Sequence, residues 1–325
     1  MVNIIMPAYN AHETIRQAIA SVAMQDEQSN ILITIVDDCS DESYDYLLQD
    51  FHYTNIELLR KVENTGCGQS RQYGIDRCTC EYFMFLDTDD CLYSPNAVKT
   101  LYNTIISDDY DYVISDFLEE VENGQYILHH NSSVWMHGKL FKTKFIKDND
   151  IRFSKTRLNE DHAFNLLVID NPHSKGRYTE YVSYVWKFNP TSLVRRVDFE
   201  EKSYSEYVDN AIYTINEFVQ KQYEGHKIID CYHKYIISFY AHYMQLLYTN
   251  KTSKYLNQYI LCIKKFFNNI PDNLPREFHK EDFVSLFYKD ETIRGLIRNN
   301  YIFDTTIMEF LSKVVEEKYD EKFEK

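Results

Sequence analysis

The chain has 325 residues, more than a typical domain of about 100 to 200, which predicts a main domain with a smaller one appended. Hydrophobic residues make up 44%, and Tyr (28) and Phe (20) far outnumber Gly (8) and Pro (6), so a disordered or fibrous protein is excluded. The formal net charge of -15 disfavours nonspecific binding to nucleic acid or anionic membranes, because their phosphate groups would be repelled.

The cysteine pattern and the N-terminus bear on the cellular compartment. The seven cysteines are odd in number and show no Cys-x-x-Cys spacing, so neither a disulfide framework nor a zinc site is predicted. Residues Met1 to Pro7 lack the basic and long apolar regions of a signal peptide, and no later run reaches about 18 apolar residues. We expect a cytoplasmic protein without a transmembrane segment, with peripheral association at the inner face of the membrane left open.

Apolar runs and amphipathic stretches alternate through the first part of the chain. The first run should end at Pro7, which lacks a backbone donor. Residues with apolar spacing typical of helices lie between the runs, from Ile15 to Ala23 and from Gln69 to Arg77. The runs that predict buried strands are Val2 to Met6, Ile31 to Val36, Ile56 to Leu59 and Tyr82 to Leu86. This alternation predicts a mostly parallel sheet flanked by helices.

The pattern changes after a further predicted helix, Asn96 to Ile106, and a strand, Tyr112 to Ser115. Phe117 to Val121 and Tyr126 to His129 flank the turn signal Glu122-Asn123-Gly124, which predicts an antiparallel hairpin at the edge of the sheet.

From about Phe199 onward, apolar and aromatic residues recur at helical spacing. The clearest stretches are Tyr207 to Phe218, Ile228 to Leu247 and Tyr255 to Phe267. We therefore predict an α/β Rossmann-like domain over residues 1–198 and an all-helical domain over 199–325. The second would bind a substrate, dock on another enzyme or form a homodimer, and its aromatic periodicity is more typical of core packing than of a ligand-binding stripe.

Acidic residues follow two of the predicted strands. Val36 precedes Asp37-Asp38-Cys39-Ser40-Asp41, and Leu86 precedes Asp87-Thr88-Asp89-Asp90. Ligands of parallel sheets gather beyond the carboxyl ends of the strands, so both clusters should reach one rim. Crowded carboxylates repel each other unless a cation neutralises them, and hard oxygen ligands favour Mg²⁺ or Mn²⁺ bridging to phosphates. The alternative for each Asp is an ordinary turn or capping role.

With these residues in place, the chain resembles the family-2 glycosyltransferases of the GT-A fold, which are inverting and metal-dependent, over roughly residues 1–198. The matching segments, in order, are Pro7-Ala8-Tyr9-Asn10, Val36-Asp37-Asp38-Cys39-Ser40, Asn64-Thr65-Gly66 through Arg71, Phe85-Leu86-Asp87-Thr88-Asp89-Asp90, and Asn159-Glu160-Asp161. Their order and spacing are more specific than any one of them alone.

The resemblance implies a role for each matched residue in binding the donor. The nucleotide-binding residues would be Pro7, Ala8, Tyr9, Asn10, Asp38, Asn64, Gly66, Arg71, Asp87 and Thr88. Asp38 would accept a hydrogen bond from the base, which suits uracil and hence UDP. Arg71 would meet phosphate, with a surface salt bridge as its alternative. Asp89 would hold Mn²⁺ or Mg²⁺, and Asp87 would contact ribose or a metal-bound water.

The resemblance also implies the groups that act on the acceptor. Asp161 would be the general base, although an Asp there would also complement the dipole of its own helix. Possible acceptor or diphosphate contacts are Trp135, His137, Glu160, Arg195 and Arg196, and buried packing explains Trp135 almost as well. The family often adds a His metal ligand near Arg195, but no His occurs between His173 and His226, so that ligand is in doubt.

These implications define an inverting transferase that moves a sugar, a hexose or N-acetylhexosamine, from a UDP-sugar to a hydroxyl of a saccharide or glycoconjugate. A sugar nucleotidyltransferase or a nicotinamide dehydrogenase would need a glycine-rich loop after the first strand, where Pro7-Ala8-Tyr9-Asn10 stands instead. A catalytically silent binding module of the same fold stays as the alternative. The donor sugar, the acceptor and the pathway are not encoded in these motifs.

Overall fold

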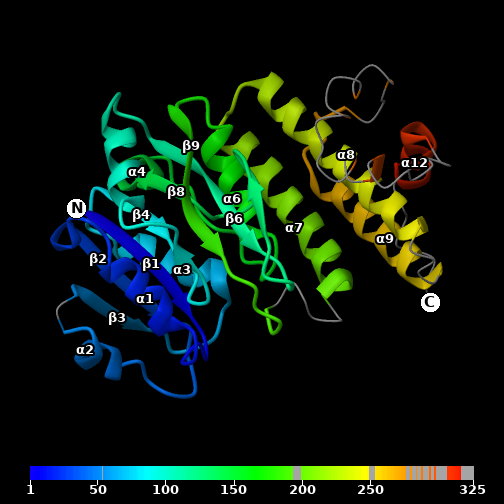
Figure 1. Ribbon diagram of the computed structural model, residues 1–325. Coiled ribbons are helices and arrows are strands. Elements are labelled where there is room, and N and C mark those ends of the chain that lie inside the picture. The colour runs from blue at the N-terminus through cyan, green and yellow to red at the C-terminus, as the bar shows by residue number, and fades with distance from the viewer. Residues whose placement is uncertain are drawn as a thin grey trace. The chain divides into compact units, whose positions relative to one another are not determined.

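The computed structural model describes residues 1–52, 54–192, 199–248, 253–275, 279, 283, 287, 293, 296, 297 and 306–315. The chain divides into two compact units, Met1–Val197 and Asp198–Lys325 (Figure 1). The first unit contains, in chain order, β1 (Val2–Ala8), α1 (Ile15–Ala23), a 3-10 turn (Gln28–Asn30), β2 (Ile31–Asp37), α2 (Tyr46–Asp50), β3 (Ile56–Arg60), α3 (Cys67–Arg77), β4 (Tyr82–Phe85), β5 (Cys91–Leu92), α4 (Ala97–Ile106), β6 (Tyr112–Glu120), β7 (Tyr126–His129), β8 (Lys139–Lys142), α5 (Thr143–Asp148), α6 (Glu160–Ile169) and β9 (Gly176–Trp186).

The strands of this unit form one nine-stranded sheet among the described residues, in the order β3-β2-β1-β4-β8-β6-β9-β5, with β7 paired to β6. Strands β3, β2, β1 and β4 run parallel, as the alternation of strands and helices predicts. Beyond β4 the sheet is mixed, because β8 runs antiparallel to both β4 and β6 while β6 and β9 are parallel. The predicted hairpin is confirmed as β6 and β7, with Gly124 at φ 75° in the turn.

The first strand continues through Pro7 to Ala8, so the prediction that it ends at the proline is wrong. The register explains why the missing donor is tolerated. Ile5 accepts a hydrogen bond from the amide of Leu86, so the backbone of Ile5, and of Pro7 two residues on, faces β4. The pairing of β1 with β4 stops at Ile5, whereas its pairing with β2 continues to Ala8. Pro7 therefore occupies a backbone position that has no strand to bond to.

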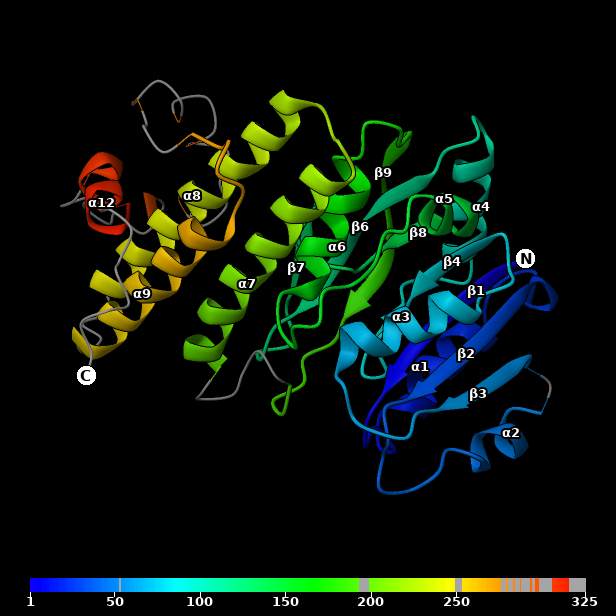
Figure 2. The same cartoon turned by 180° about the vertical axis from the view of Figure 1, so that it is seen from behind.

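The sheet buries a different core on each face. Ile4 and Met6 of β1 pack with Ile15 and Ile19 of α1 in a large apolar cluster. On the other face α3 packs on β1 and β2, with Gly74 against Ile5 (Figure 2).

An aromatic cluster extends this second face from β4 to α6. Phe85 lies edge-on to Phe164 of α6, and Phe153 stacks on Phe164 with ring centroids 4.2 Å apart. The ring of Phe83 stacks on Phe141 of β8. This packing fixes the start of α6 relative to the end of β4, where the two acidic segments lie.

The second unit consists, in its described part, of α7 (Phe199–Gln220), α8 (Gly225–Tyr248), α9 (Ser253–Asn269) and α12 (Ile307–Val314). Helices α7, α8 and α9 pack against one another, and α12 packs on α8 and α9 (Figure 2). Their aromatic residues form the core, with Phe218, Tyr232, Tyr235 and Phe239 almost fully buried. In the described part of the chain, no helix combines the length and the apolar character that crossing a bilayer requires.

Gly74 offers a test of how α3 is seated. A Cβ at this position would lie 2.5 Å from Cγ2 of Ile5 and 3.3 Å from Cγ2 of Val36. Overpacking costs about 1–3 kcal/mol and the gain in helix propensity offsets up to about 1 kcal/mol. We expect Gly74→Ala to lower the free energy of unfolding by about 1–2 kcal/mol in urea denaturation. Gly225→Ala is the control, since its Cβ would meet nothing within 4 Å. Equal stability of the two variants would contradict this seating.

Candidate functional site

The acidic segments follow the carboxyl ends of β2 and β4, as predicted. Ala8 of β1 is in register with Asp37 of β2, and β1 pairs with β4 up to Ile5 and Phe85. The loops after β1, β2 and β4 therefore leave the sheet on the same side. This brings Asn10, Asp38 and Asp87, all predicted donor-binding residues, to one rim.

Asp38 is buried and holds the loop that precedes α3. Its Oδ1 accepts hydrogen bonds from Nζ of Lys61 (2.6 Å) and from the amide of Thr65 (3.1 Å). Its Oδ2 accepts one from the amide of Gly66 (2.8 Å). Gly66 caps α3 with φ 93°, a backbone conformation that residues other than glycine rarely adopt. Asp38 thus positions the amino end of α3.

Two basic residues that the sequence reasoning missed support the same loop. Lys61 follows β3 directly and also contacts the hydroxyls of Thr65 and Ser70. Arg157 donates to the side-chain and main-chain oxygens of Asn64, each at 3.0 Å. The position of Lys61 at the end of a predicted parallel strand was the available signal, whereas nothing in the local sequence points to Arg157.

Asn10 joins the loops that follow β1 and β2. Its φ is 48°, its amide donates to Oγ of Ser40 (2.9 Å), and its side chain exchanges two hydrogen bonds with Asp41. Pro7 and Ala8 are buried within β1, while Tyr9 beside them is 53% exposed. Tyr9 is therefore accessible to a ligand, and Asn10 holds the two loops together.

Arg71 connects the acidic end of β4 to the start of α6. Its guanidinium donates to Oδ1 of Asp87 (2.7 Å) and to Oε1 of Glu160 (3.1 Å), and its side chain is only 5% exposed. Arg71 was expected to meet phosphate, with a surface salt bridge as the alternative; the structure shows a buried salt bridge with two carboxylates. Such an ion keeps its charge only because the partners offset the loss of hydration. Burial, the largest single effect, lowers the pKa of Arg71, but Asp87, Cys67, Glu160 and Asp161 together outweigh it, so the pKa lies well above the ordinary value.

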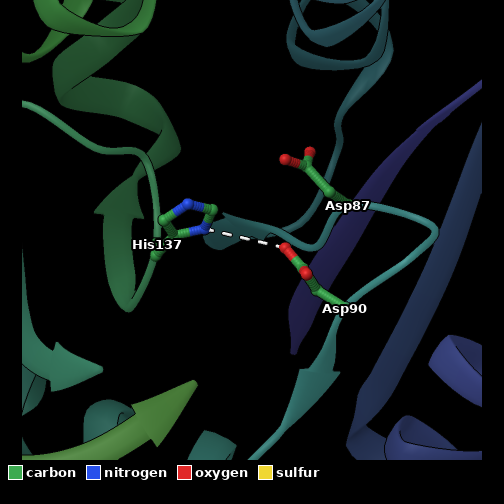
Figure 3. Close-up of side chains that lie close together, drawn as sticks. All are labelled: Asp87, Asp90 and His137. Carbon is green, nitrogen blue, oxygen red and sulfur yellow. Dashed lines mark ion pairs between the residues drawn. The ribbon is translucent and has the colours of Figure 1, made fainter. Parts of the chain in front are cut away.

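The turn after β4 contains the candidate metal centre. Ligand atoms of Asp87, Asp90 and His137 all lie within 4.8 Å of one another (Figure 3). Asp90 is buried, accepts hydrogen bonds from the hydroxyl of Tyr184 (2.6 Å) and the amide of Lys187 (2.8 Å), and lies 3.8 Å from Nδ1 of His137. Two carboxylates suit Mg²⁺ or Mn²⁺, and the imidazole beside them favours Mn²⁺ of the two.

This grouping differs from the predicted one. Asp89, the expected metal ligand, has its Oδ2 2.8 Å from Nδ2 of Asn189 and is not in the group of three. Asp87, expected at ribose, is in it, and Thr88 beside it is buried. His137, expected near the acceptor, is the third member of the group. A His metal ligand was expected near Arg195 instead, in a stretch after His173 that contains none. His137 lies just before β8, and only the antiparallel pairing of β8 with β4 brings it to the turn.

Electrostatics at the turn are consistent with a cation site. Burial, together with the neighbouring carboxylates of Asp87 and Asp89, raises the pKa of Asp90 well above its ordinary value. Burial, the largest single effect, raises the pKa of Asp87, but the charge and hydrogen bond of Arg71 together with His137 outweigh it, so the net shift is downward. Burial lowers the pKa of His137 to about 3, so the imidazole is neutral at pH 7 and has a lone pair to offer a metal.

Asp161 and Glu160 form the first turn of α6, as predicted. Glu160 is buried against Arg71; burial, followed by the charge of Asp161, raises its pKa, and the guanidinium of Arg71 opposes that rise. Burial likewise raises the pKa of Asp161, whose Oδ1 accepts a hydrogen bond from the amide of His162 (2.9 Å). Among the remaining predicted contacts, Trp135 lies beside His137, and Arg195 and Arg196 fall outside the described residues.

The fold of the first unit is that of the GT-A glycosyltransferases. A glycosyl transferase family 2 model matches residues 3–160, a little under half of the chain. TarS (residues 1–349) of S. aureus, solved with UDP-GlcNAc, superimposes with a TM-score of 0.70 at 15% identity over 93% of both chains. The mannosyltransferase PcManGT of Pyrobaculum calidifontis, solved with GDP-Man and Mn²⁺, matches with a TM-score of 0.54 at 10% identity over 96% of this chain and 85% of its own.

Curated relatives align over about a third of the chain. A processive diacylglycerol beta-glycosyltransferase of Mycoplasma genitalium is 30% identical over 115 residues, 34% of this chain and 33% of that protein. The minor teichoic acid biosynthesis protein GgaA of Bacillus subtilis is 32% identical over 109 residues, 32% of this chain and 24% of that protein. The chain thus matches a third or less of the length of these relatives.

The affinity for Mn²⁺ tests whether Asp90 or Asp89 is the metal ligand. We expect Asp90→Asn to weaken Mn²⁺ binding at least tenfold, because it removes one of three grouped ligands, whereas Asp89→Asn should change it less than threefold. Free Mn²⁺ measured by electron paramagnetic resonance gives both affinities. Asp108→Asn, an exposed carboxylate paired with Lys175, is the control. A loss in Asp89→Asn as large as in Asp90→Asn would contradict the assignment.

Proposed function

We propose that the chain transfers a sugar from a UDP-sugar to a hydroxyl of a saccharide or glycoconjugate, in one displacement that inverts the anomeric centre. The observation that carries the proposal is the pair of contacts from Arg71 to Asp87 and Glu160. Through Asp87, Arg71 is connected to the candidate three-ligand metal centre. Through Glu160, it is connected to the first turn of α6, where Asp161 is a half-buried carboxylate. The TarS and PcManGT structures, solved with nucleotide diphosphate sugars, support the choice of donor class.

The choice of UDP rests on Asp38. Its Oδ2 accepts a hydrogen bond from the amide of Gly66, and the second lone pair of that oxygen could accept another from a uracil N–H. The same contact would seat the diphosphate near the amino end of α3, where backbone N–H groups favour anions. TarS was also solved with UDP, which agrees with this choice.

The residues of the chain divide the chemistry between them. A bound divalent cation, held by Asp87, Asp90 and His137, would offset the charge that develops on the departing diphosphate. Asp161 takes the proton of the acceptor hydroxyl on a carboxylate oxygen while that hydroxyl attacks the anomeric carbon. Burial raises the pKa of Asp161, which makes its carboxylate a stronger base than a solvated one. Glu160, paired with Arg71, holds the first turn of α6 in place.

We also propose the sugar, the cation and the compartment. The donor sugar is a hexose or N-acetylhexosamine, the cation is Mn²⁺ or Mg²⁺, and the protein acts in the cytoplasm. The helical unit binds the acceptor or forms a homodimer. A catalytically silent binding module is the outcome that the first experiment distinguishes.

The donor experiment is release of UDP from a panel of UDP-sugars, with GDP-mannose as the comparison. We expect UDP release in the presence of Mn²⁺ that disappears with chelator, because the diphosphate then lacks its counter-charge. Coupled detection of free UDP and mass spectrometry of the sugar measure the rate and the donor. Absence of release from every donor, with intact binding of UDP, would indicate the silent module.

Asp161→Asn tests the general base. Base catalysis contributes about 10² to 10⁴-fold, so transfer should fall at least a hundredfold while the Kd for UDP stays within about twofold. Isothermal titration calorimetry measures the Kd. Asp148→Asn, an exposed carboxylate on α5 that pairs with Lys144, is the control. Turnover within threefold of the parent in Asp161→Asn would remove Asp161 from this role.

A further inference from the structure

The chain has only two tryptophans, and the fold brings them together beside the metal centre. Trp135 precedes β8 and Trp186 is the last residue of β9, 51 positions later by their numbers. Their ring centroids lie 4.9 Å apart, with the planes at 43°. Both rings are half-buried at the edge of the large apolar cluster rather than enclosed in it. Two large aromatic rings are thus displayed together at the margin of a polar site.

His137 connects this pair of rings to the acidic turn. Its ring lies 5.3 Å from that of Trp186 at 22°, and 6.2 Å from that of Trp135 at 27°. The same imidazole belongs to the group with Asp87 and Asp90. A ligand bound to the tryptophans would therefore be separated from the candidate metal centre only by the imidazole of His137.

The backbone of Trp135 is tied to the helix of Asp161. The carbonyl of Trp135 accepts hydrogen bonds from Nδ2 of Asn165 (3.1 Å) and from Nζ of Lys139. Asn165 lies four residues after Asp161 on α6, so the two share a face of the helix. Lys139 is 1% exposed, and a buried ammonium is tolerated only where it is hydrogen-bonded or paired. These contacts fix Trp135 in relation to the proposed base.

We infer that Trp135 and Trp186 form the binding platform for the acceptor sugar, and that the acceptor is a pyranoside presenting a face of C–H bonds to the two indoles. The inference rests on the proposed function and names its acceptor class. An indole binds apolar area on its face while its N–H stays available to a polar partner, which suits a ring with hydroxyls at its rim. The ties of Trp135 to α6 then set an acceptor hydroxyl toward Asp161.

Tryptophan fluorescence tests the platform without requiring turnover. Since both tryptophans lie in it, all of the indole emission reports on this place. Protein with UDP and Mg²⁺, a diamagnetic ion, is titrated with the methyl β-glycosides of glucose, galactose and N-acetylglucosamine. We expect a saturable change in emission with at least one glycoside and none with glycerol at equal concentration. No saturable change with any of the three would overturn the inference.

Steady-state kinetics provide a second experiment. They distinguish a failure of the tryptophan platform from a failure of the proposed function. The acceptor is the methyl glycoside that shifts the emission. Trp186→Ala should raise its KM at least tenfold and lower the ratio of sugar transfer to donor hydrolysis by a similar factor, while Trp186→Phe recovers most of both. Tyr93→Ala, which removes an aromatic ring that is 53% exposed elsewhere in the unit, is the control.

The two failures have different signatures. If the parent protein hydrolyses UDP-sugars but Trp186→Ala keeps its acceptor KM within twofold, the platform is wrong and the proposed function stands. If the parent releases no UDP from any donor but the emission change saturates, the platform stands as a glycan-binding site and the proposed function fails.

Discussion

The buried guanidinium of Arg71 is the contact on which the rest of the site depends. Asp87 follows a strand and Glu160 begins a helix, and the two lie 73 positions apart by their numbers. Without a cation between them, these carboxylates would repel each other in a poorly hydrated interior. Because a buried charge must be matched closely, the pairing fixes α3, β4 and α6 to one another more strictly than apolar packing would. Gly74 allows α3 close to the sheet, and the Phe85, Phe153 and Phe164 rings fill the space beneath.

Much of the fold could be predicted from the sequence because local patterns determine it. The strands at residues 2, 31, 56 and 82 and the helix from Ile15 to Ala23 follow from short apolar runs and apolar spacing, and the hairpin from Asn123-Gly124. The mixed part of the sheet was not predictable in this way. The position of β8 between β4 and β6, and the pairing of β9 with β6, depend on contacts between residues distant in the chain.

The same distinction explains the site. Residues that follow a strand, such as Asp38 and Asp87, were found because the topology of a parallel sheet gives them a common rim. His137 and Trp186 reach that rim through the mixed half of the sheet, so no motif spacing pointed to them as partners. Asp89 was favoured over Asp90 as the metal ligand because an Asp-x-Asp pattern does not show which carboxylate lies beside His137. In the structure it is Asp90, which is held by hydrogen bonds from Tyr184 and the amide of Lys187, so Asp90 is the ligand that we propose.

Together these features describe a centre in which the charge of Arg71 holds α3, β4 and α6 together, and in which, under the proposed function, a divalent ion would complete the charge balance toward the substrate. The most direct measurement is anomalous diffraction at the manganese edge from crystals grown with UDP and Mn²⁺. The account predicts one strong peak among the carboxylates of Asp87 and Asp90, the imidazole of His137 and the diphosphate, with Arg71 still bonded to Asp87 and Glu160. A peak held by Asp89 away from His137, or a nucleotide bound with no peak, would contradict it.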